Sequence, residues 1–218
     1  MNIFLDIETI KAEQVDDKYL KLDSRLKDPE KIAIAQQNAL EKTVFDGAFG
    51  ECVSIAWAID DYSVVGVGRR TEDEADFLKI ALDMLQSHVF KRATQVGIAE
   101  YRKTWIGHNI AFDLGFLFKR CAVLGVNSPI RIPWPVNPWD RNIKDTAYMW
   151  EGRQHTVSLD KLSHVLLGEG KETGGSEVAK MWVNKQYDDI LKYNMDDVRK
   201  TRDVFKNMEN VNGSQETE

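Results

Sequence analysis

The sequence has few cysteines, few histidines and no long apolar segment. Its 218 residues include two cysteines and four histidines. Cys52 and Cys121 lack the spacing of a metal site, so we expect buried free thiols in a reducing compartment. No apolar run is long enough for a membrane helix, and the N-terminus has no signal-peptide pattern. These absences predict a cytoplasmic protein without a membrane partner.

An excess of basic residues is also absent. The 35 acidic residues outnumber the 29 basic ones, which gives a formal net charge of -6. This balance argues against indiscriminate binding to a polyanion. It does not exclude a nucleic-acid enzyme with a local basic rim, because a cluster of catalytic carboxylates itself lowers the net charge. The hydrophobic fraction of 43% is sufficient for a core, and the length predicts one domain.

The most informative stretch is an apolar run that leads into two carboxylates, residues 2–9 (NIFLDIET). Such a run predicts a buried central strand. Side chains on a strand alternate between faces, so Asp6 and Glu8 point the same way and repel each other unless a cation lies between them. Carboxylate oxygens suit Mg²⁺ or Mn²⁺. An exposed strand end, with both carboxylates in water, is the alternative interpretation.

A second group of polar residues lies where a predicted strand, 104–107, turns into a helix. Asn109 and Asp113 are four positions apart, so both can face one side of the helix start. The helix dipole favours an acid in the first turn anyway, which is a purely structural explanation of Asp113. His108 has no second histidine at a metal-binding spacing, and we expect it to be structural.

The last predicted helix, about 188–207, carries the sequence YNMDD at residues 193–197. Tyr193 and Asp197 fall on a stripe of this helix that is otherwise mostly apolar. A carboxylate on a core-facing stripe is costly unless it is paired or ligated. Asp196 lies about 100° away around the helix, and we expect it to be solvated. A core tyrosine with a satisfied hydroxyl is the alternative interpretation of Tyr193.

Three spaced motifs therefore follow one another along the chain: Asp6-x-Glu8, Asn109-x-x-x-Asp113 and Tyr193-x-x-x-Asp197. In this order they resemble the exonuclease motifs of the DEDD superfamily. The tyrosine places the resemblance in the DEDDy branch, with polymerase proofreading domains and the ribonuclease D group. Further segments are similar to small stand-alone exonucleases that are related to family B polymerase proofreading domains and occur in bacteria and phages: 28–32 (DPEKI), 144–146 (KDT), 158–162 (SLDKL) and 175–178 (GSEV).

The resemblance implies an α/β fold of the ribonuclease H-like type, a five-stranded mixed sheet in the order 3-2-1-4-5 with helices on both faces. The sequence pattern agrees, because three predicted meander strands precede alternating strands and helices. One exonuclease domain would span residues 1–209, with an insertion at about 11–50 that contains a helix predicted from Pro29 to about Thr43. Residues 210–218 are polar and are expected to be a disordered tail.

The resemblance also assigns roles to individual residues. The ligands of two divalent ions, Mg²⁺ or Mn²⁺, about 3.5–4 Å apart, would be Asp6, Glu8, Asp113 and Asp197. Tyr193 would orient the attacking water. The expected substrate contacts are Thr9, Asn109 by a hydrogen bond, Phe112 by stacking, and Lys171 through a phosphate. A place in the core is the alternative for Phe112.

The function that follows is a metal-dependent 3′–5′ exonuclease acting on single-stranded DNA in the cytoplasm of a bacterial or phage-infected cell. The same chemistry on RNA is the nearest alternative. A catalytically silent module that binds nucleic-acid ends or a replisome protein is a second alternative, and the presence of all four carboxylates argues against it. The insertion at 11–50 leaves the central strand beside Glu8, which predicts a lid that admits one strand.

Overall fold

A computed structural model of the chain places most of its residues. The structure describes residues 1–20, 22–23, 25, 27–71, 73–96, 102–137, 139–152, 157–170 and 176–211. Lys171, the expected phosphate contact, and residues 212–218 of the expected tail lie outside these ranges.

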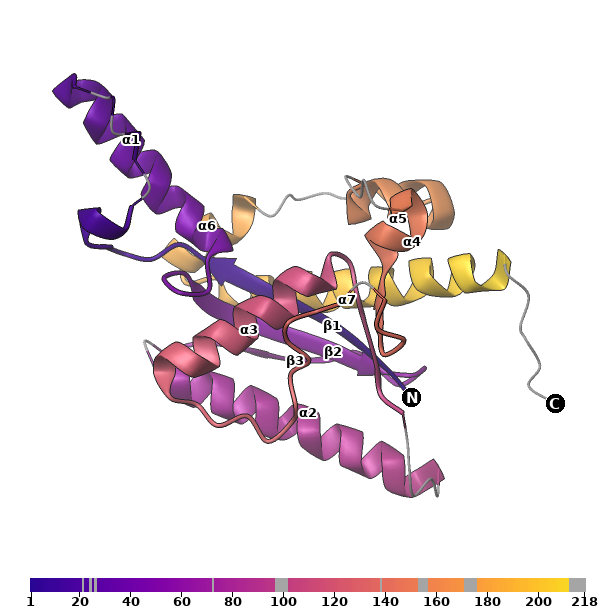
Figure 1. The fold of residues 1–218 in the computed structure, drawn as a ribbon. Coiled ribbons are helices and arrows are strands. Elements are labelled where there is room, and N and C mark those ends of the chain that lie inside the picture. The colour runs from indigo at the N-terminus through magenta and orange to yellow at the C-terminus, as the bar shows by residue number, and fades with distance from the viewer. Residues whose placement is uncertain are drawn as a thin grey trace.

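The described residues form one five-stranded mixed sheet in the order β3-β2-β1-β4-β5 (Figure 1). The strands are β1 (Asn2–Ile10), β2 (Glu51–Ile59), β3 (Val65–Gly68), β4 (Thr104–Gly107) and β5 (Ile143–Asp145). β1 pairs with β2 antiparallel and with β4 parallel; β3 is antiparallel to β2, and β5 is parallel to β4. The predicted fold class and strand order are confirmed, and β1 is the central strand.

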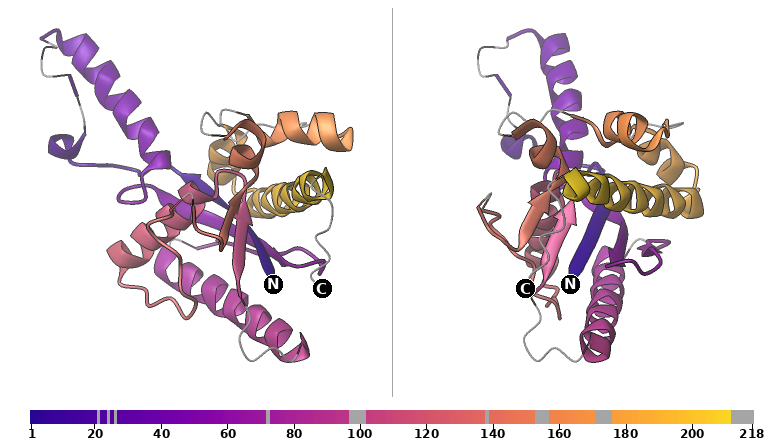
Figure 2. Two further views of the ribbon diagram at one scale, coloured as in Figure 1. Left: turned by 45° about the vertical axis from the view of Figure 1, so that its right-hand side comes forward. Right: turned by 90° about the vertical axis from the view of Figure 1, so that its right-hand side faces the viewer.

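Helices cover both faces of this sheet (Figures 1 and 2). On one face lie α2 (Glu74–Val96) and α3 (Ile110–Leu124). The long α7 (Tyr187–Val211) crosses the other face, beside α4 (Thr146–Glu151), α5 (Leu159–Leu167) and α6 (Ser176–Val183). The last helix is longer than predicted, because the polar residues after Asn207 continue it, and residues 210 and 211 therefore belong to the helix rather than to a tail.

The side chains of β1 alternate between these two layers. The side chains that enter the core under α2 and α3 are Ile3, Leu5 and Ile7. Phe4 points to the opposite face, where its ring lies 5.6 Å from that of Phe205 on α7. Asp6 and Glu8 continue the α7 face, because they are separated from Phe4 by even steps along the strand. The strand thus delivers both carboxylates to the same side, as its sequence pattern predicts.

β1 is longer than its parallel neighbour, and this difference opens space beside its second half. Of the residues of β1, only Asn2–Phe4 pair with β4, which ends at Gly107. A Cβ atom on Gly107 would lie 2.6 Å from Cδ1 of Ile110 and 3.0 Å from the carbonyl oxygen of Leu5. Only glycine therefore allows the first turn of α3 to pack this closely against β1. The start of α3 replaces β4 as the neighbour of the acidic half of β1.

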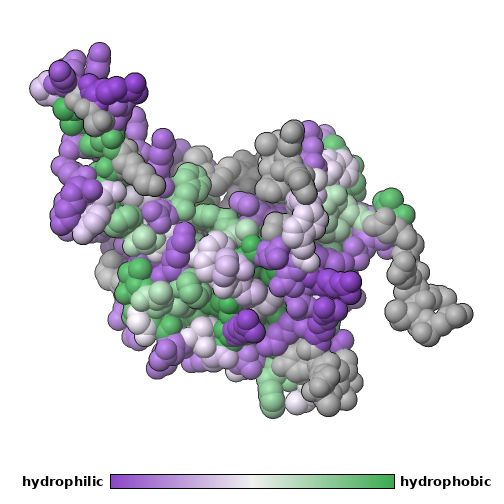
Figure 3. Space-filling view, viewed as in Figure 1, coloured by the Kyte–Doolittle hydropathy of each residue, from purple (hydrophilic) through white to green (hydrophobic). Residues whose placement is uncertain are grey.

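The insertion, residues 11–50, meets the sheet at its base, where the N–H of Ala12 donates to the hydroxyl of Thr43. It contains two 3-10 turns, η1 (Asp17–Tyr19) and η2 (Lys42–Phe45), and the helix α1 (Pro29–Glu41), which begins at the predicted residue. No residue of α1 is buried, and the helix projects away from the body in all views (Figures 1 and 2). This projecting part of the insertion is hydrophilic at its tip and carries hydrophobic residues along its length (Figure 3). The helix α1 thus projects away from the end of β1, whereas η2 lies against it.

Candidate active site

Three carboxylates meet where α7 crosses β1. Asp6, Glu8 and Asp197 each offer one oxygen, and these oxygens lie within 4.8 Å of one another. Asp197 is only 8% exposed, as expected from its place on the core-facing stripe of α7. Like charges this close raise the free energy of the fold unless a cation or protons neutralise them. The structure therefore brings together three of the four predicted metal ligands.

This donor set fits a hard divalent cation. Mg²⁺ binds carboxylate oxygens at about 2.0–2.1 Å, so two ligands of one ion lie at most about 4.2 Å apart. The three oxygens, now within 4.8 Å, would need to approach only slightly. Such a shift is within reach of side-chain torsions.

Asp113, the fourth predicted ligand, is held beside this group of three rather than within it. Its Oδ1 accepts a hydrogen bond from the backbone N–H of Ile7 over 3.1 Å, on the edge of β1 that β4 leaves uncovered. Burial raises the pKa of Asp113 well above its ordinary value, and the negative charge of nearby Asp6 raises it further. Burial and the charge of Asp6 thus both disfavour the ionised form of Asp113.

Tyr193 lies one helical turn before Asp197 and faces the same group of acids. Its half-buried ring packs against a cluster that includes Ile10 and Ile190, and its hydroxyl hydrogen-bonds with Asp197. Burial raises the pKa of the phenol, and the negative charges of Asp197 and Glu8 raise it further. The ring of Tyr193 thus belongs to the core, whereas its neutral hydroxyl belongs to the site. The interpretation as a core residue and the interpretation as a site residue each describe one part of the side chain.

Asn194 is the residue that sequence reasoning missed. Its side chain is fully buried, and its Nδ2 donates a hydrogen bond to Oδ2 of Asp6 over 2.6 Å. Its Oδ1 accepts a hydrogen bond from the hydroxyl of Ser54 over 2.8 Å. Position 194 is four residues after buried Ile190 and four before buried Val198, and a polar residue at that spacing was the available signal.

Ser54 reaches Asn194 from β2 next to an irregularity in strand pairing. Glu8 is opposite Ser54, but the next residue of β1, Thr9, is opposite Cys52, which leaves Val53 as an additional residue. Bulges of this kind re-aim side chains and are common beside active sites. The irregularity coincides with the position of the second carboxylate.

The three described residues that were expected to contact substrate have different surroundings. Thr9 uses its hydroxyl to donate a hydrogen bond to the carbonyl of Val44 over 2.9 Å, so it anchors the insertion. Asn109 precedes α3 with a left-handed φ of 63°, and its side chain is exposed whereas that of Asp113 is buried. Phe112 is half-buried and contacts the exposed ring of Phe45. Asn109 and Phe112 thus remain accessible to a ligand.

His108 is surrounded by structural partners, in agreement with its predicted role. Its Nε2 lies 3.0 Å from the carbonyl oxygen of Val157, which can only accept, so this nitrogen carries a proton. Its Nδ1 lies 3.0 Å from the hydroxyl oxygen of Thr146, which lies 3.2 Å from the carbonyl oxygen of Gly107. The ring links β4 to the segment that precedes α5.

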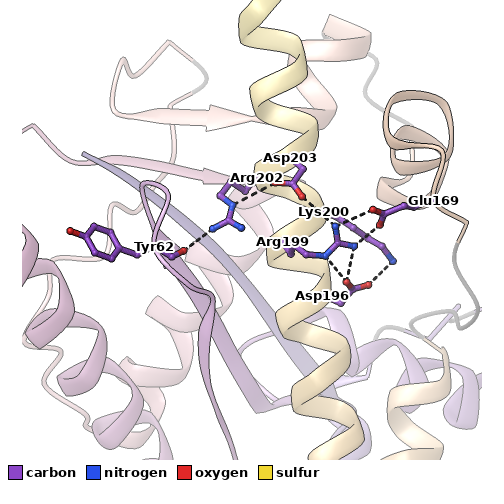
Figure 4. Close-up of polar contacts among 7 residues, drawn as sticks. All are labelled: Tyr62, Glu169, Asp196, Arg199, Lys200, Arg202 and Asp203. Carbon is purple, nitrogen blue, oxygen red and sulfur yellow. Dashed lines mark hydrogen bonds and ion pairs between the residues drawn. The ribbon is translucent and has the colours of Figure 1, made fainter.

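An ion-pair network lies on α7 next to the site (Figure 4). It borders a groove of about 910 Å³ that is lined by Tyr193 and by the network itself. Arg199 contacts Asp196 at 2.9 Å and Glu169, just after α5, at 3.2 Å, and Lys200 contacts Asp196 at 2.7 Å. Asp196, which we expected to be solvated, is partly exposed and paired with both cations. The network joins the end of α5 to the helix that carries Asp197.

No protein-family model matches the sequence, and a search of curated proteins finds no similar one. The resemblance to the DEDDy branch therefore rests on the motifs alone. Within the described part of the chain, no helix is both long enough and apolar enough to cross a membrane.

Proposed function

We propose that the protein is a metal-dependent 3′–5′ exonuclease that removes nucleotides from single-stranded DNA. The observation that carries this proposal is the meeting of Asp6, Glu8 and Asp197 within 4.8 Å, on the two elements that the motif order predicts. Tyr193 supports it, since its neutral hydroxyl faces these carboxylates. The choice of DNA and of the 3′ end comes from the resemblance of the motifs to proofreading exonucleases.

The residues divide into ligands and groups that hold them. Asp6, Glu8 and Asp197 would hold one divalent ion, and Asp6 with Asp113 a second. When bound, such ions acidify the attacking water and stabilise the leaving oxygen. The amide of Asn194 fixes Asp6, and the N–H of Ile7 fixes Asp113.

The protein also has to orient the nucleophile and the strand. The hydroxyl of Tyr193 would hydrogen-bond the attacking water, a role supported by its hydrogen bond with Asp197 and by its raised pKa. Asn109 would hydrogen-bond the terminal nucleotide, and its exposure at the start of α3 supports this role. Positioning and proton-transfer groups of this kind are typically worth about 10²–10⁴-fold in rate.

The test is the degradation of end-labelled strands. Single-stranded DNA, duplex DNA and RNA of the same sequence are incubated with Mg²⁺, Mn²⁺ or a chelator, and the products are resolved by length. We expect stepwise shortening from the 3′ end of single-stranded DNA with either metal, and none with chelator or with Asp6→Asn. A strand blocked at its 3′ end should resist, and a strand blocked at its 5′ end should not.

Other outcomes would replace the proposal. Faster shortening of RNA than of DNA would make the protein an exoribonuclease. Tight binding of strand ends without hydrolysis by any metal would make it a silent end-binding module. Equal shortening of a 3′-blocked strand would refute the polarity.

A further inference from the structure

We propose that the free edge of β3 binds an extended segment of another protein, which adds a strand to the sheet. The segment would direct apolar side chains towards α2 and acidic side chains towards α7. This inference goes beyond the proposed function and does not depend on it, because β2 separates β3 from the strand that carries the carboxylates.

β3 is the edge of the sheet, and its sequence does not protect it. Within the described part of the chain, β3 pairs with β2 alone, from Trp57↔Val65 to Ser54↔Gly68, without a register shift. Natural edge strands avoid further pairing by means of charged side chains, proline or bulges. Residues 64–68 (VVGVG) contain neither a charged residue nor a proline. The edge is therefore a ready template for another strand.

The side chains of β3 alternate between the two helical layers. Val65 and Val67 pack against the core under α2, whereas Val64 packs on the α7 side. Gly66 also faces α7, since a Cβ atom there would lie 2.8 Å from Cδ1 of Leu191. A strand that joined this edge would continue both surfaces, with its side chains pointing alternately towards α2 and towards α7.

On the α2 side, a pocket of about 240 Å³ opens beside the edge. Its apolar floor includes Val65 and the nearly buried Trp57 and Ile59. Lys91 and Arg92 of α2 also line it, and no acidic residue is among the described residues that do so. Arg92 is paired with Asp60 outside the pocket, but Lys91 is exposed. An apolar floor with a basic rim fits an apolar side chain whose neighbours are acidic.

Exposed apolar side chains of α2 extend this surface along the strand. Met84 and Ile80 precede the pocket residue His88 by one and two helical turns, so they lie on the same side of the helix. They are 37% and 55% exposed, and α2 packs against β3. Two helical turns cover about 11 Å, close to the roughly 13 Å that four strand residues span. An added strand could therefore bury apolar side chains along the whole of β3.

On the α7 side, the available charge is positive. Lys192 is exposed, has no ion-pair partner among the residues that the structure describes, and lines the same groove as Val64. The other charged residues of that groove are engaged: Arg199 and Lys200 with Asp196, Arg199 with Glu169, and Asp189 with Gln186. An acidic side chain on this side of an added strand would pair with Lys192.

A second copy of this chain fits the edge less well than a separate segment does. If two β3 strands paired with each other, Val65 and Val67 of each copy would stay in their own core, and both pockets would remain unfilled. Residues 64–68 also offer no acidic group to Lys192. The pattern that the edge selects is alternation of apolar and acidic residues.

The probes are fluorescein-labelled heptapeptides in which glutamate alternates with valine, leucine or phenylalanine. Fluorescence anisotropy follows their binding to the full-length protein. We expect binding in the micromolar range. Peptides of the same composition, with the apolar residues placed consecutively, should bind at least about 10-fold more weakly, because one or more apolar side chains are no longer buried.

Methylated peptides test whether the backbone pairs. Successive N–H groups of a strand point to opposite edges, so N-methylation of every second residue removes the donors from one edge only. We expect one of the two possible methylated peptides to lose binding and the other to keep it. Hydrogen exchange of the protein should slow within residues 64–68 when the unmethylated peptide is bound.

Variants of the protein test the two surfaces. Met84→Glu should weaken binding about 10-fold, because it removes an apolar contact, and Lys192→Glu should weaken it about 2- to 5-fold. Phe90→Glu is the matched control, since Phe90 is 61% exposed on the same helix but lies about 200° around it from His88. It should bind the peptides as the wild type does. Circular dichroism shows whether each variant is folded.

The inference is overturned if none of the alternating peptides binds at millimolar concentration, or if both methylated peptides bind equally. A loss in Phe90→Glu equal to that in Met84→Glu would also overturn it. Sedimentation of the protein alone adds a further outcome, since a dimer that Met84→Glu converts into a monomer would assign the edge to a second copy. None of these measurements involves hydrolysis, so their failure leaves the proposed function untouched.

Discussion

Asn194 of α7 donates its side-chain amide to Oδ2 of Asp6 on β1, over 2.6 Å and across 188 positions of the chain. The same amide group accepts a hydrogen bond from the hydroxyl of Ser54 on β2. This one buried side chain therefore connects α7 with both β1 and β2. The helix α7 is thereby aligned with the central strand by a contact that also fixes a carboxylate. A neutral donor suits this place, because it stabilises Asp6 without competing with a cation for the other oxygens.

Replacement of Asn194 should therefore weaken metal binding. Asn194→Leu keeps a similar volume but removes the donor to Asp6 and leaves the Ser54 hydroxyl buried without its acceptor. We expect the apparent affinity for Mg²⁺, or the activity, to fall about 10–100-fold, and the free energy of unfolding to fall by about 1–3 kcal/mol. Mg²⁺ titration of activity and urea unfolding measure the two effects. Ser54→Ala is the control, since it should spare most of the metal affinity, and an unchanged Mg²⁺ dependence in Asn194→Leu would contradict the prediction.

Asp6→Asn should abolish hydrolysis without destabilising the metal-free fold. The variant removes one of three clustered charges but keeps an oxygen that can accept from Asn194. Thermal unfolding in chelator should give a Tm equal to or above that of the wild type. Addition of Mg²⁺ should raise the Tm of the wild type only, because a ligand stabilises the state that binds it. A Tm rise of the same size in both proteins would place the metal elsewhere.

Tyr193 and Asp197 should differ in how much activity remains after their replacement. Tyr193→Phe keeps the ring in its apolar cluster but removes the hydroxyl, so kcat should fall by about 10²-fold with little change in KM. Asp197→Asn would remove one of the proposed metal ligands and should cost more activity. The values of kcat at saturating single-stranded DNA show which of the two replacements costs more activity. If Tyr193→Phe is as active as the wild type, the tyrosine belongs to the core alone.

A buried ion pair between α2 and α3 should matter for stability and not for chemistry. Glu74 accepts from Nε of Arg120 over 3.0 Å and from the N–H of Cys52 over 2.7 Å. Arg120→Met would leave a carboxylate that is nearly buried without its cation. Loss of one partner of such a pair costs about 3–5 kcal/mol, which urea unfolding would show. The pair Arg70 and Asp188 is exposed and gives a control, since Arg70→Met should change stability by less than about 1 kcal/mol.

The two thiols should be unreactive in the folded protein at neutral pH. Cys52 and Cys121 are free and buried, and burial raises the pKa of both, that of Cys121 from an ordinary value of 9.0 to about 11. Because the thiolate is the reactive form, a thiol reagent at pH 8 should label neither in the native state and both in denaturant. A raised pKa also means that the thiol favours the fold below pH 9 and that this contribution is lost as the pH rises towards 11. Rapid native labelling would show that the thiols are accessible.

Some of this molecule could be derived from its sequence because the relevant signals are local. The alternation along β1 placed Asp6 and Glu8 on one face, and the stripe on α7 placed Asp197 towards the core. The partner of Asn194 could not be derived this way, since no local pattern specifies a residue 188 positions away. The hydrogen bond from Ile7 to Asp113 could not be predicted for another reason. Its donor is a backbone N–H, which almost every residue type has, so the sequence carries no signal for it. The direction of α1 was equally unpredictable, as it depends on how η2 is anchored.

The carboxylates of the acidic group lie on β1 and on α7, which are far apart in the sequence. This separation determines when the group can form during synthesis. During synthesis, Asp6 and Glu8 leave the ribosome early, but Asp197 follows only after every strand of the sheet has been made. Until α7 has folded back across the finished sheet, the third carboxylate and Asn194 are missing. On the proposed function, a chain whose α7 has not yet packed on the sheet is therefore unable to degrade nucleic acid. The order of elements along the chain thus makes the acidic group one of the last parts of the molecule to assemble.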